Sequence, residues 1–182
     1  MKRALVLLAF VSACACSAKK PPPDTVREAA KPPATLQFAA DGTVQSLRFN
    51  GGALWFCDAR GSHRVDLGTG TLTKDDTPCP PPEEPNAGCG LPNLDVSVRS
   101  PLSETNDILD LKAASFPLTG RVHDCAVAGN HLVVGTGSAV YVIDTAKNTI
   151  KTISSDLGDR VAVSQDWVAW IDVTSVHIAR LG

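Results

Sequence analysis

Beyond residue 35 the chain alternates short apolar runs with turn-forming residues. The runs are rich in Val, Ile, Leu and aromatic residues, and Gly, Asn, Asp or Ser separates them, as at residues 51–52, 68–70 and 129–130. Short apolar or alternating runs between turn residues are typical of β-strands. No apolar stripe at helical spacing continues for three turns. The pattern therefore predicts an all-β domain over residues 35–182.

The strand pattern also repeats. A shift of 36 residues places residues 126–128, 132–134 and 140–142 on residues 162–164, 168–170 and 176–178. A shift of 78 residues places residues 54–56, 65–66 and 71–72 on residues 132–134, 143–144 and 149–150. The two shifts leave room for one more, diverged copy, whose last two strands we expect at residues 106–111 and 115–118. A period near 40 residues with four strands per period predicts a β-propeller of about four blades.

The last copy stops at residues 181–182, before its fourth strand. At the other end of the domain, residues 35–38 have a strand pattern that belongs to no copy. We expect this N-terminal strand to complete the last blade, since an unpaired edge invites aggregation. Two interpretations remain: a small four-bladed or partly open propeller, which we favour, and a truncated part of a larger ring.

The repeated residues resemble a known class of propeller repeat. Residues 132–135 (LVVG) and 141–150 (YVIDTAKNTI) resemble the bacterial surface-type repeats called YVTN repeats and, more loosely, quinoprotein-like repeats. Residues 53–58 and 65–70 resemble the same class. The resemblance covers residues 43–182 in three clear copies and one diverged copy. It implies a propeller and no particular activity, because such propellers host many unrelated functions.

Residues 1–13 have the pattern of an export signal. Lys2 and Arg3 precede ten apolar or small residues, about half of the 20 or so that a membrane-spanning helix needs. Residues 11–14 (VSAC) resemble the bacterial lipobox, which implies cleavage before Cys14 and a lipid, such as a palmitate-bearing diacylglycerol, on Cys14. Cys16 is the alternative lipidation site, and ordinary secretory cleavage near residues 13–15 is a further alternative. Each interpretation exports the protein.

Residues 14–34 then form a proline-rich linker with five prolines and no apolar cluster. Such a segment behaves as a semi-rigid spacer, so we expect it to tether the domain to a membrane. An Asp directly after the lipidated cysteine resembles the inner-membrane retention signal of Gram-negative lipoproteins. Neither Cys14 nor Cys16 is followed by Asp, which favours the outer membrane, on its periplasmic or its surface face.

An acidic, proline-rich insert occupies residues 74–93. Cys79 and Cys89 bracket it, and an exported protein meets an oxidising compartment, so we expect a Cys79–Cys89 disulfide. We expect Cys57 and Cys125, which lie in predicted strands, to be buried bystanders, although one of them could pair with an insert cysteine instead. Zinc is disfavoured because the chain lacks four ligands at zinc-site spacing.

The aligned histidines raise the question of a metal site. His63 and His177 both align on Tyr141, so a ring of equivalent side chains could bind a metal. Packing explains the same pattern, and we favour a structural role without metal. Asp66 and Asp144 recur because a turn recurs. The chain has no nucleophile elbow, phosphate loop or catalytic carboxylate pair, so we expect no enzyme and no cofactor.

Charge narrows the partner class. The chain has 17 Lys and Arg against 19 Asp and Glu, and without residues 1–13 the balance is 15 against 19. This argues against nucleic acid, which selects a basic excess. The sequence therefore predicts a membrane-anchored cell-envelope lipoprotein whose domain binds a protein or a glycan. The alternative is an enzyme or cofactor-binding propeller of the quinoprotein type, or a fragment of one.

Overall fold

A computed structural model describes residues 34–182 except residues 92–93, 103 and 113. The chain divides into two units, Met1–Ala30 and Lys31–Gly182, and the described residues belong to the second. They form strands, turns and loops, with no helix among them. The predictions about the export signal, Cys14 and most of the linker lie outside the described residues.

Four antiparallel sheets make up the described domain, and we number them blade 1 to blade 4 in chain order. Blade 1 contains β2 (Ser46–Asn50), β3 (Ala53–Asp58), β4 (Gly61–Asp66) and β5 (Thr71–Asp75). Blade 2 contains β6 (Val96–Arg99), β7 (Ile108–Leu111) and β8 (Ala114–Pro117). Blade 3 contains β9 (Val122–Ala128), β10 (His131–Thr136), β11 (Val140–Asp144) and β12 (Thr149–Ser154). Blade 4 contains β13 (Arg160–Val163), β14 (Trp167–Ile171), β15 (Ser175–Arg180) and β1 (Thr35–Ala39).

The N-terminal strand completes the last blade, as predicted. β1 pairs with β15 in antiparallel register from Thr35 opposite Ala179 to Ala39 opposite Ser175. A backbone hydrogen bond from Arg180 N to Ala34 O (3.0 Å) extends the ladder by one position. Blade 4 thereby acquires the fourth strand that its own repeat lacks.

The repeat is also visible in the backbone at the turns. Gly51 and Gly129, 78 residues apart, have φ values of 54° and 56°. Gly70 and Asn148, at the same spacing, have φ values of 72° and 52°. Only Gly and, less readily, Asn adopt such left-handed conformations at low cost. The two copies therefore need Gly or Asn at the same turn positions, because the backbone there is left-handed.

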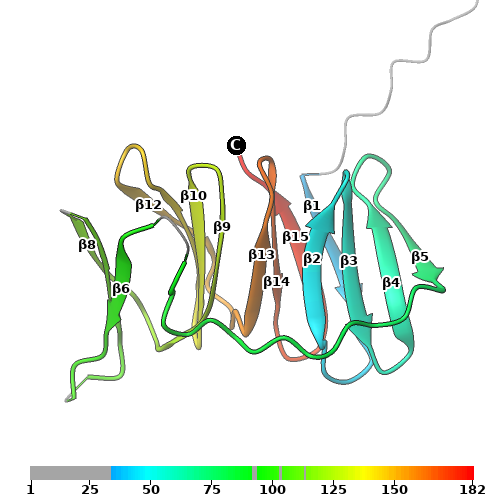
Figure 1. Cartoon of the computed structure of the whole chain (residues 1–182), viewed down its shortest axis with the longest axis horizontal. Helices are drawn as coiled ribbons and strands as arrows, with labels where there is room; N and C mark the ends of the chain where they lie inside the picture. Colours follow the sequence, from blue (N-terminus) through cyan, green and yellow to red (C-terminus); the bar gives the residue numbers. More distant parts are fainter. Residues whose placement is uncertain (1–33, 92–93, 103, 113) are drawn as a thin grey trace, which may run out of the picture. The chain divides into compact units, whose positions relative to one another are not determined.

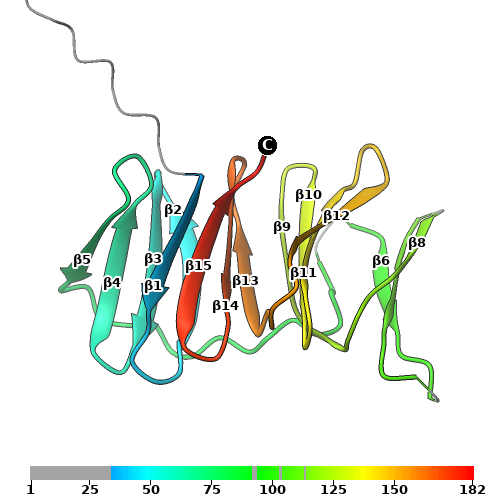
Figure 2. The same ribbon diagram turned by 180° about the vertical axis from the view of Figure 1, so that it is seen from behind.

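The blades stand side by side in the order 2, 3, 4, 1 (Figures 1 and 2). Blades 1 and 2, consecutive in the chain, lie at opposite ends of this row, and the segment after β5 runs along the row to reach β6. The described residues thus form a small, open β-propeller, which confirms the all-β, four-bladed prediction in its partly open form.

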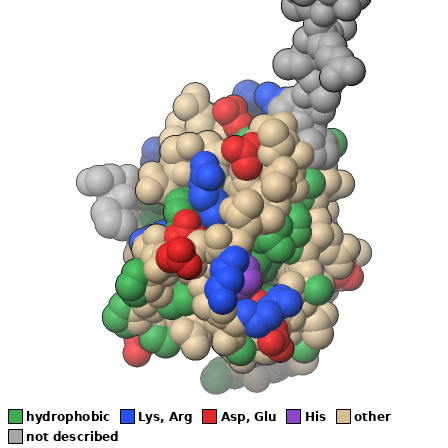
Figure 3. Space-filling model, turned by 90° about the vertical axis from the view of Figure 1, so that its right-hand side faces the viewer, with side chains coloured by type: hydrophobic (Ala, Val, Ile, Leu, Met, Phe, Trp, Pro, Cys, Tyr) green, Lys and Arg blue, Asp and Glu red, His purple; other side chains and the backbone are tan. Residues whose placement is uncertain are grey.

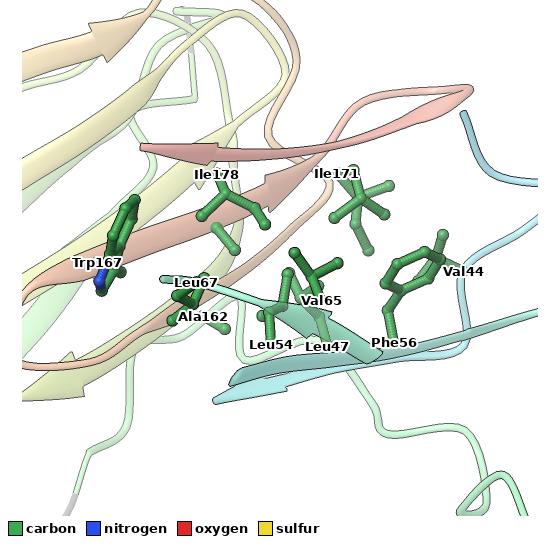
Figure 4. Packing of buried hydrophobic residues seen from close by; sticks show 12 residues of the cluster. Val44, Leu47, Leu54, Phe56, Val65, Leu67, Ala162, Trp167, Ile171 and Ile178 are labelled. Carbon is green, nitrogen blue, oxygen red and sulfur yellow. The ribbon is translucent and has the colours of Figure 1, made fainter. Parts of the chain in front are cut away.

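Each pair of neighbouring blades shares a hydrophobic core. Twelve buried residues lie between blades 1 and 4, among them Leu54, Phe56, Val65 and Ile178 (Figure 4). A second cluster joins blades 4 and 3, and a third joins blades 3 and 2. Full burial of one such side chain contributes about 1.5–3 kcal/mol, so these interfaces hold the row together.

Burial differs between the middle and the ends of the row. In blades 3 and 4, β10 is buried from Leu132 to Thr136 and β14 is buried throughout, because each of these blades packs against a neighbour on both faces. In blade 2, by contrast, β6 and β7 alternate between inward and outward positions. The outward face of blade 2 is polar and carries an ion pair of Arg99 with Asp110, and this contact lowers the pKa of Asp110 to about 2.

The opposite end of the row carries charged side chains among apolar ones (Figure 3). On the outward face of blade 1, the cross-strand neighbours Arg48, Trp55, Arg64 and Thr73 form one row, and the Arg64 guanidinium lies 5.8 Å from the Trp55 ring centre. Figure 3 views the end of the domain at β4 and β5 and shows side chains of both charges next to one another. Neither sign of charge dominates this view.

A pair of buried aspartates links successive blades. Asp107, which precedes β7, accepts hydrogen bonds from Val122 N in blade 3 (2.8 Å), from Ser100 Oγ and from Arg121. Burial alone would raise the pKa of Asp107, but these hydrogen bonds hold it below its ordinary value. Asp124 makes the equivalent link from blade 3 to blade 4, as described below.

Candidate binding cleft

The proline-rich insert crosses the row as a strap, which we define as residues 79–89. Cys79 is bonded to Cys57 of β3, with 5.8 Å between Cα atoms, and Cys89 is bonded to Cys125 of β9, with 5.2 Å between Cα atoms. The predicted Cys79–Cys89 bridge is therefore wrong. The alternative, that a strand cysteine pairs with an insert cysteine, holds for both.

The course of the insert explains this pairing. A disulfide requires Cα atoms about 4.4–6.8 Å apart. The insert leaves β5 in blade 1 and travels along the row toward blade 2 (Figure 1), so its two cysteines reach different blades. Each then meets the cysteine of the blade it passes. The strap is consequently bonded at one end to blade 1 and at the other to blade 3.

Buried Asp124 on β9 provides a third attachment. One carboxylate oxygen, Oδ1, accepts a hydrogen bond from Asn86 N of the strap (2.7 Å), and Oδ2 accepts one from Val161 N of β13 (3.0 Å). The Asn86 side chain in turn accepts a hydrogen bond from Gly90 N (3.1 Å). One carboxylate thus fixes the strap, blade 3 and blade 4 together. Sequence reasoning did not single out Asp124, because its partners are distant backbone amides.

Between the strap and the first strands of blades 1, 3 and 4 lies a cleft of about 380 Å³. The strap contributes Glu83 and Glu84, β2 contributes Arg48, and Arg160 begins β13. The apolar part of the lining comes from β2, β9 and β13, and includes Leu47, Phe49, Ala126, Val161, Ala162 and Val163. Both charge signs therefore stand at fixed places around an apolar floor.

A second hollow of about 400 Å³ continues the cleft along β2 and β13. It shares Phe49 and Val163 with the first, and it extends to the turns at residues 51–52 and 165–166. Cavities of a few hundred Å³ with an apolar lining and a few polar groups are the usual form of a ligand site. The two hollows together suit an elongated ligand.

The lining of the cleft combines apolar, acidic and basic side chains. None of the residues that line it is a His or a free thiol, since its cysteine, Cys125, is in a disulfide. The structure shows no nucleophile beside a base in this lining. The cleft offers apolar contact together with three carboxylates, of Glu83, Glu84 and Asp124, and two guanidinium groups, of Arg48 and Arg160.

The aligned histidines lie outside the cleft and have a structural arrangement that repeats. His63 stacks on Phe56 (ring centres 4.8 Å apart) and its Nε2 lies 2.8 Å from Asp58 Oδ1. In blade 4, at positions 114 residues further on, His177 stacks on Trp170 (5.1 Å) with its Nε2 2.7 Å from Asp172 Oδ2.

In blade 3, Tyr141 occupies the histidine position, and its hydroxyl oxygen accepts a hydrogen bond from Thr119 N (2.9 Å). Each aligned side chain is thus engaged within the protein. The two other histidines lie apart: His123 contacts Asp159 (3.4 Å), and His131 begins β10. Within the described residues, no group of three His, Cys, Asp or Glu side chains is placed to hold a metal ion.

The two aspartates that contact these histidines, Asp58 and Asp172, also accept hydrogen bonds from backbone amides in turns. Asp58 accepts hydrogen bonds from Asp41 N (2.9 Å) and Arg60 N (2.8 Å) as well as contacting His63. Burial opposes its ionisation, but these hydrogen bonds lower the pKa of Asp58 to about 2. Asp172 is held in the same way, with a lowered pKa.

Asp66 and Asp144 have the turn role predicted for them. The Oδ1 atom of Asp66 accepts hydrogen bonds from the amides of Gly68 and Thr69, and that of Asp144 from the amides of Ala146 and Lys147. These hydrogen bonds contribute to the lowered pKa of both carboxyl groups.

No family model matches the chain, and no curated protein matches it. Solved structures with some likeness include a computationally designed protein, Ika4, with 12% identity and a TM-score of 0.34, covering 78% of this chain and 93% of that one. The N-terminal domain of Nup159 (10% identity, TM-score 0.29, 78% of this chain) and the AfRom2 CNH domain (12%, 0.25, 84%) are also similar. The chain spans 47% of the Nup159 domain and 59% of the AfRom2 domain.

At these identities and scores, the likenesses carry no argument about function. In the part of the chain that the structure describes, there is no helix of the length and apolarity needed to cross a membrane.

Proposed function

We propose that the protein is a lipid-anchored cell-envelope binding module whose strapped cleft holds a segment of a partner protein or a glycan. The observation that carries the proposal is the strap, which two disulfides and the Asp124 hydrogen bond fix over the first strands of three blades. A preformed cleft loses little conformational freedom on binding, so more of the contact energy appears as affinity.

The lining suggests how a ligand would be held. Partly buried Phe49, Ala126 and Val163 offer apolar contact, while Arg48, Arg160, Glu83 and Glu84 supply charges of both signs. A ligand with both polar and apolar groups satisfies this lining. Sugars and extended peptides have this character.

Anchoring is proposed from the sequence alone. The lipobox-like residues 11–14 and the proline-rich linker that follows are the two features that support it. The linker would connect a lipid on Cys14 to the domain at Ala34, at the cell envelope and, by the absence of Asp after the cysteine, at the outer membrane.

Metabolic labelling tests the anchor. We expect wild-type protein to incorporate radiolabelled palmitate and Cys14→Ser to lose it, with Cys16→Ser as the matched control that retains the label. Label that survives Cys14→Ser, or disappears only with Cys16→Ser, would show that the lipid is not on Cys14.

Photo-crosslinking in cells tests the cleft. A photo-reactive amino acid replaces Glu84, and the control places the same group at Thr73, which is exposed on the edge strand β5. We expect a discrete adduct from position 84 that is lost when Arg160→Glu is added. The same adducts from both positions, or none from position 84, would refute binding in the cleft.

A further inference from the structure

A third hollow, with a different chemistry, lies where blades 3 and 4 meet. It has a volume of about 200 Å³, and its walls carry one carboxylate, that of Asp144 on β11, and three cations, Lys147 in the β11–β12 turn, Lys151 on β12 and Arg180 at the end of β15. Val142, Ile153 and Leu181 supply apolar lining. None of these residues lines the strapped cleft.

The cations in this hollow are only partly neutralised. Lys147 pairs with Asp144 (3.0 Å). Among the described residues, no acidic side chain forms an ion pair with Lys151 or Arg180 within 4.0 Å. The Arg180 guanidinium lies 5.9 Å from the Trp167 ring centre, so its face is occupied while its N–H groups stay available.

The hollow lies close to the point where the linker joins the domain. Ala34, the first described residue, accepts the hydrogen bond from Arg180 N (3.0 Å). The chain that precedes the domain therefore joins it directly beside the hollow. If Cys14 carries a lipid, a membrane surface is tethered to this end of blade 4, which raises the local concentration of lipid head groups there.

We propose that this hollow, formed by Lys147, Lys151 and Arg180, is a binding site for the phosphate of an anionic phospholipid head group. The inference rests on the proposed lipid anchoring, because the anchor is what brings the membrane to this end of the domain. A phosphate is the ligand that an Arg and two Lys side chains bind best, by charge and by hydrogen bonds. Binding would turn blade 4 toward the membrane and set the orientation of the domain on its tether.

Vesicle binding by a chain without lipid tests this site apart from the anchor. The chain from residue 14 onward, without the apolar export signal and carrying Cys14→Ser and Cys16→Ser, is mixed with phosphatidylcholine vesicles that contain phosphatidylglycerol, and the bound fraction is measured by sedimentation. Each basic residue near an anionic surface is worth roughly 1 kcal/mol, so Lys151→Ala should weaken binding about fivefold and Lys151→Ala with Arg180→Ala about 25-fold.

Lys74→Ala is the matched control, because Lys74 is equally exposed and lies on β5 of blade 1. We expect it to change binding by less than about twofold. Raising the salt from about 0.1 M to about 1 M should release the wild-type chain, since the Debye length falls from roughly 10 Å to 3 Å. Circular dichroism of each variant confirms that the fold is retained.

The proposal is overturned if vesicles with phosphatidylglycerol are not bound, if pure phosphatidylcholine is bound equally well, or if Lys74→Ala weakens binding as much as Lys151→Ala. Soluble glycerol phosphate that displaces the chain at a concentration comparable to that of the lipid would mean that a free phosphate, and not a membrane, is the ligand. Palmitate labelling decides the anchor separately, so the two failures are distinguishable.

Discussion

Blades 3 and 4 can pack closely only because Gly135 and Gly158 have no Cβ atom. Gly135 lies in β10 and Gly158 precedes β13, and Gly158 N donates a hydrogen bond to Thr136 O (2.8 Å). A Cβ on Gly135 would overlap the carbonyl oxygen of Gly158, and one on Gly158 would lie 2.7 Å from Val140 Cγ2. Blades 3 and 4 approach this closely because neither residue has a side chain.

We therefore expect Gly135→Ala to lower the free energy of unfolding by about 1–3 kcal/mol, the usual cost of overpacking. Urea unfolding measures it. The control is Gly88→Ala in the strap, where an added Cβ meets nothing within 4 Å and the stability should stay within about 0.5 kcal/mol. Equal stability of the two variants would contradict the close approach of the blades.

The buried side chain of Asp58 makes the stability of the fold depend on pH. Its folded-state pKa of about 2 lies below the ordinary value of 3.8, so the charged form stabilises the fold. The contribution is fully present above about pH 4, amounts to roughly 2 kcal/mol, and is lost as the pH falls toward 2.

Asp58→Asn should accordingly be less stable than wild type by about 2 kcal/mol at pH 7, with the difference shrinking toward zero at about pH 2. Urea unfolding across this pH range tests it. Asp76→Asn, the same change at an exposed position of the insert, should follow the wild-type curve. A constant gap between Asp58→Asn and wild type would show that the carboxylate charge is not the cause.

At the scale of elements, β1 is the strand whose removal is most informative. It contributes five paired positions to β15 and half-buries Leu36 and Phe38 against the core between blades 1 and 4. Deleting residues 35–39 should lower the stability by several kcal/mol, from about 1 kcal/mol per lost hydrogen bond and the lost apolar burial.

The denaturant midpoint of the deletion variant measures this effect. If the deletion variant does not fold, Phe38→Ala is the milder substitution. We expect it to lower the free energy of unfolding by about 1–3 kcal/mol. Thr35→Ala, at an exposed position of the same strand, is the control. An unchanged midpoint for both the deletion and Phe38→Ala would mean that β1 does not close blade 4 in solution.

Much of the element pattern was predictable from the sequence because local rules produce it. The shifts of 36 and 78 residues locate β9 to β15 and β3 to β5, since each copy needs the same turn residues and the same apolar faces. β6 (Val96–Arg99) was missed. It is four residues long and follows an insert with no counterpart in the other copies, so the repeat could not point to it.

The disulfides and the order of the blades could not be predicted for a different reason. Both depend on which blades pack together, and the sequence period is the same whether blade 1 meets blade 2 or blade 4. The spacing of Cys79 and Cys89 favoured a local bridge, whereas the long reach of the insert brings Cys79 to Cys57 and Cys89 to Cys125. The links that Asp107 and Asp124 make between blades were not predicted either, because their partners include backbone amides of other blades.

For the whole domain, the open row predicts a gradient of local stability. β10 and β14 are central strands of blades that pack on both faces, whereas β5 and β6 are edge strands at the two ends of the row. Amide hydrogen exchange should be slowest in β10 and β14, with opening free energies about 2–3 kcal/mol above those of β5 and β6. Uniform protection across all four blades would instead indicate a closed ring in solution.

The path of the chain through β1 has a mechanical consequence. Any pull on the residues before Ala34 enters the domain through β1, and Ala34 and Arg180 are hydrogen-bonded at the same end of blade 4. A load that pulls the residues before Ala34 sideways, away from β15, breaks the β1–β15 ladder one hydrogen bond at a time, beginning at Ala34 and Arg180. Blade 4 would therefore yield first. The two disulfides of the strap, which hold blades 1 and 3 by covalent bonds, would continue to bear the force.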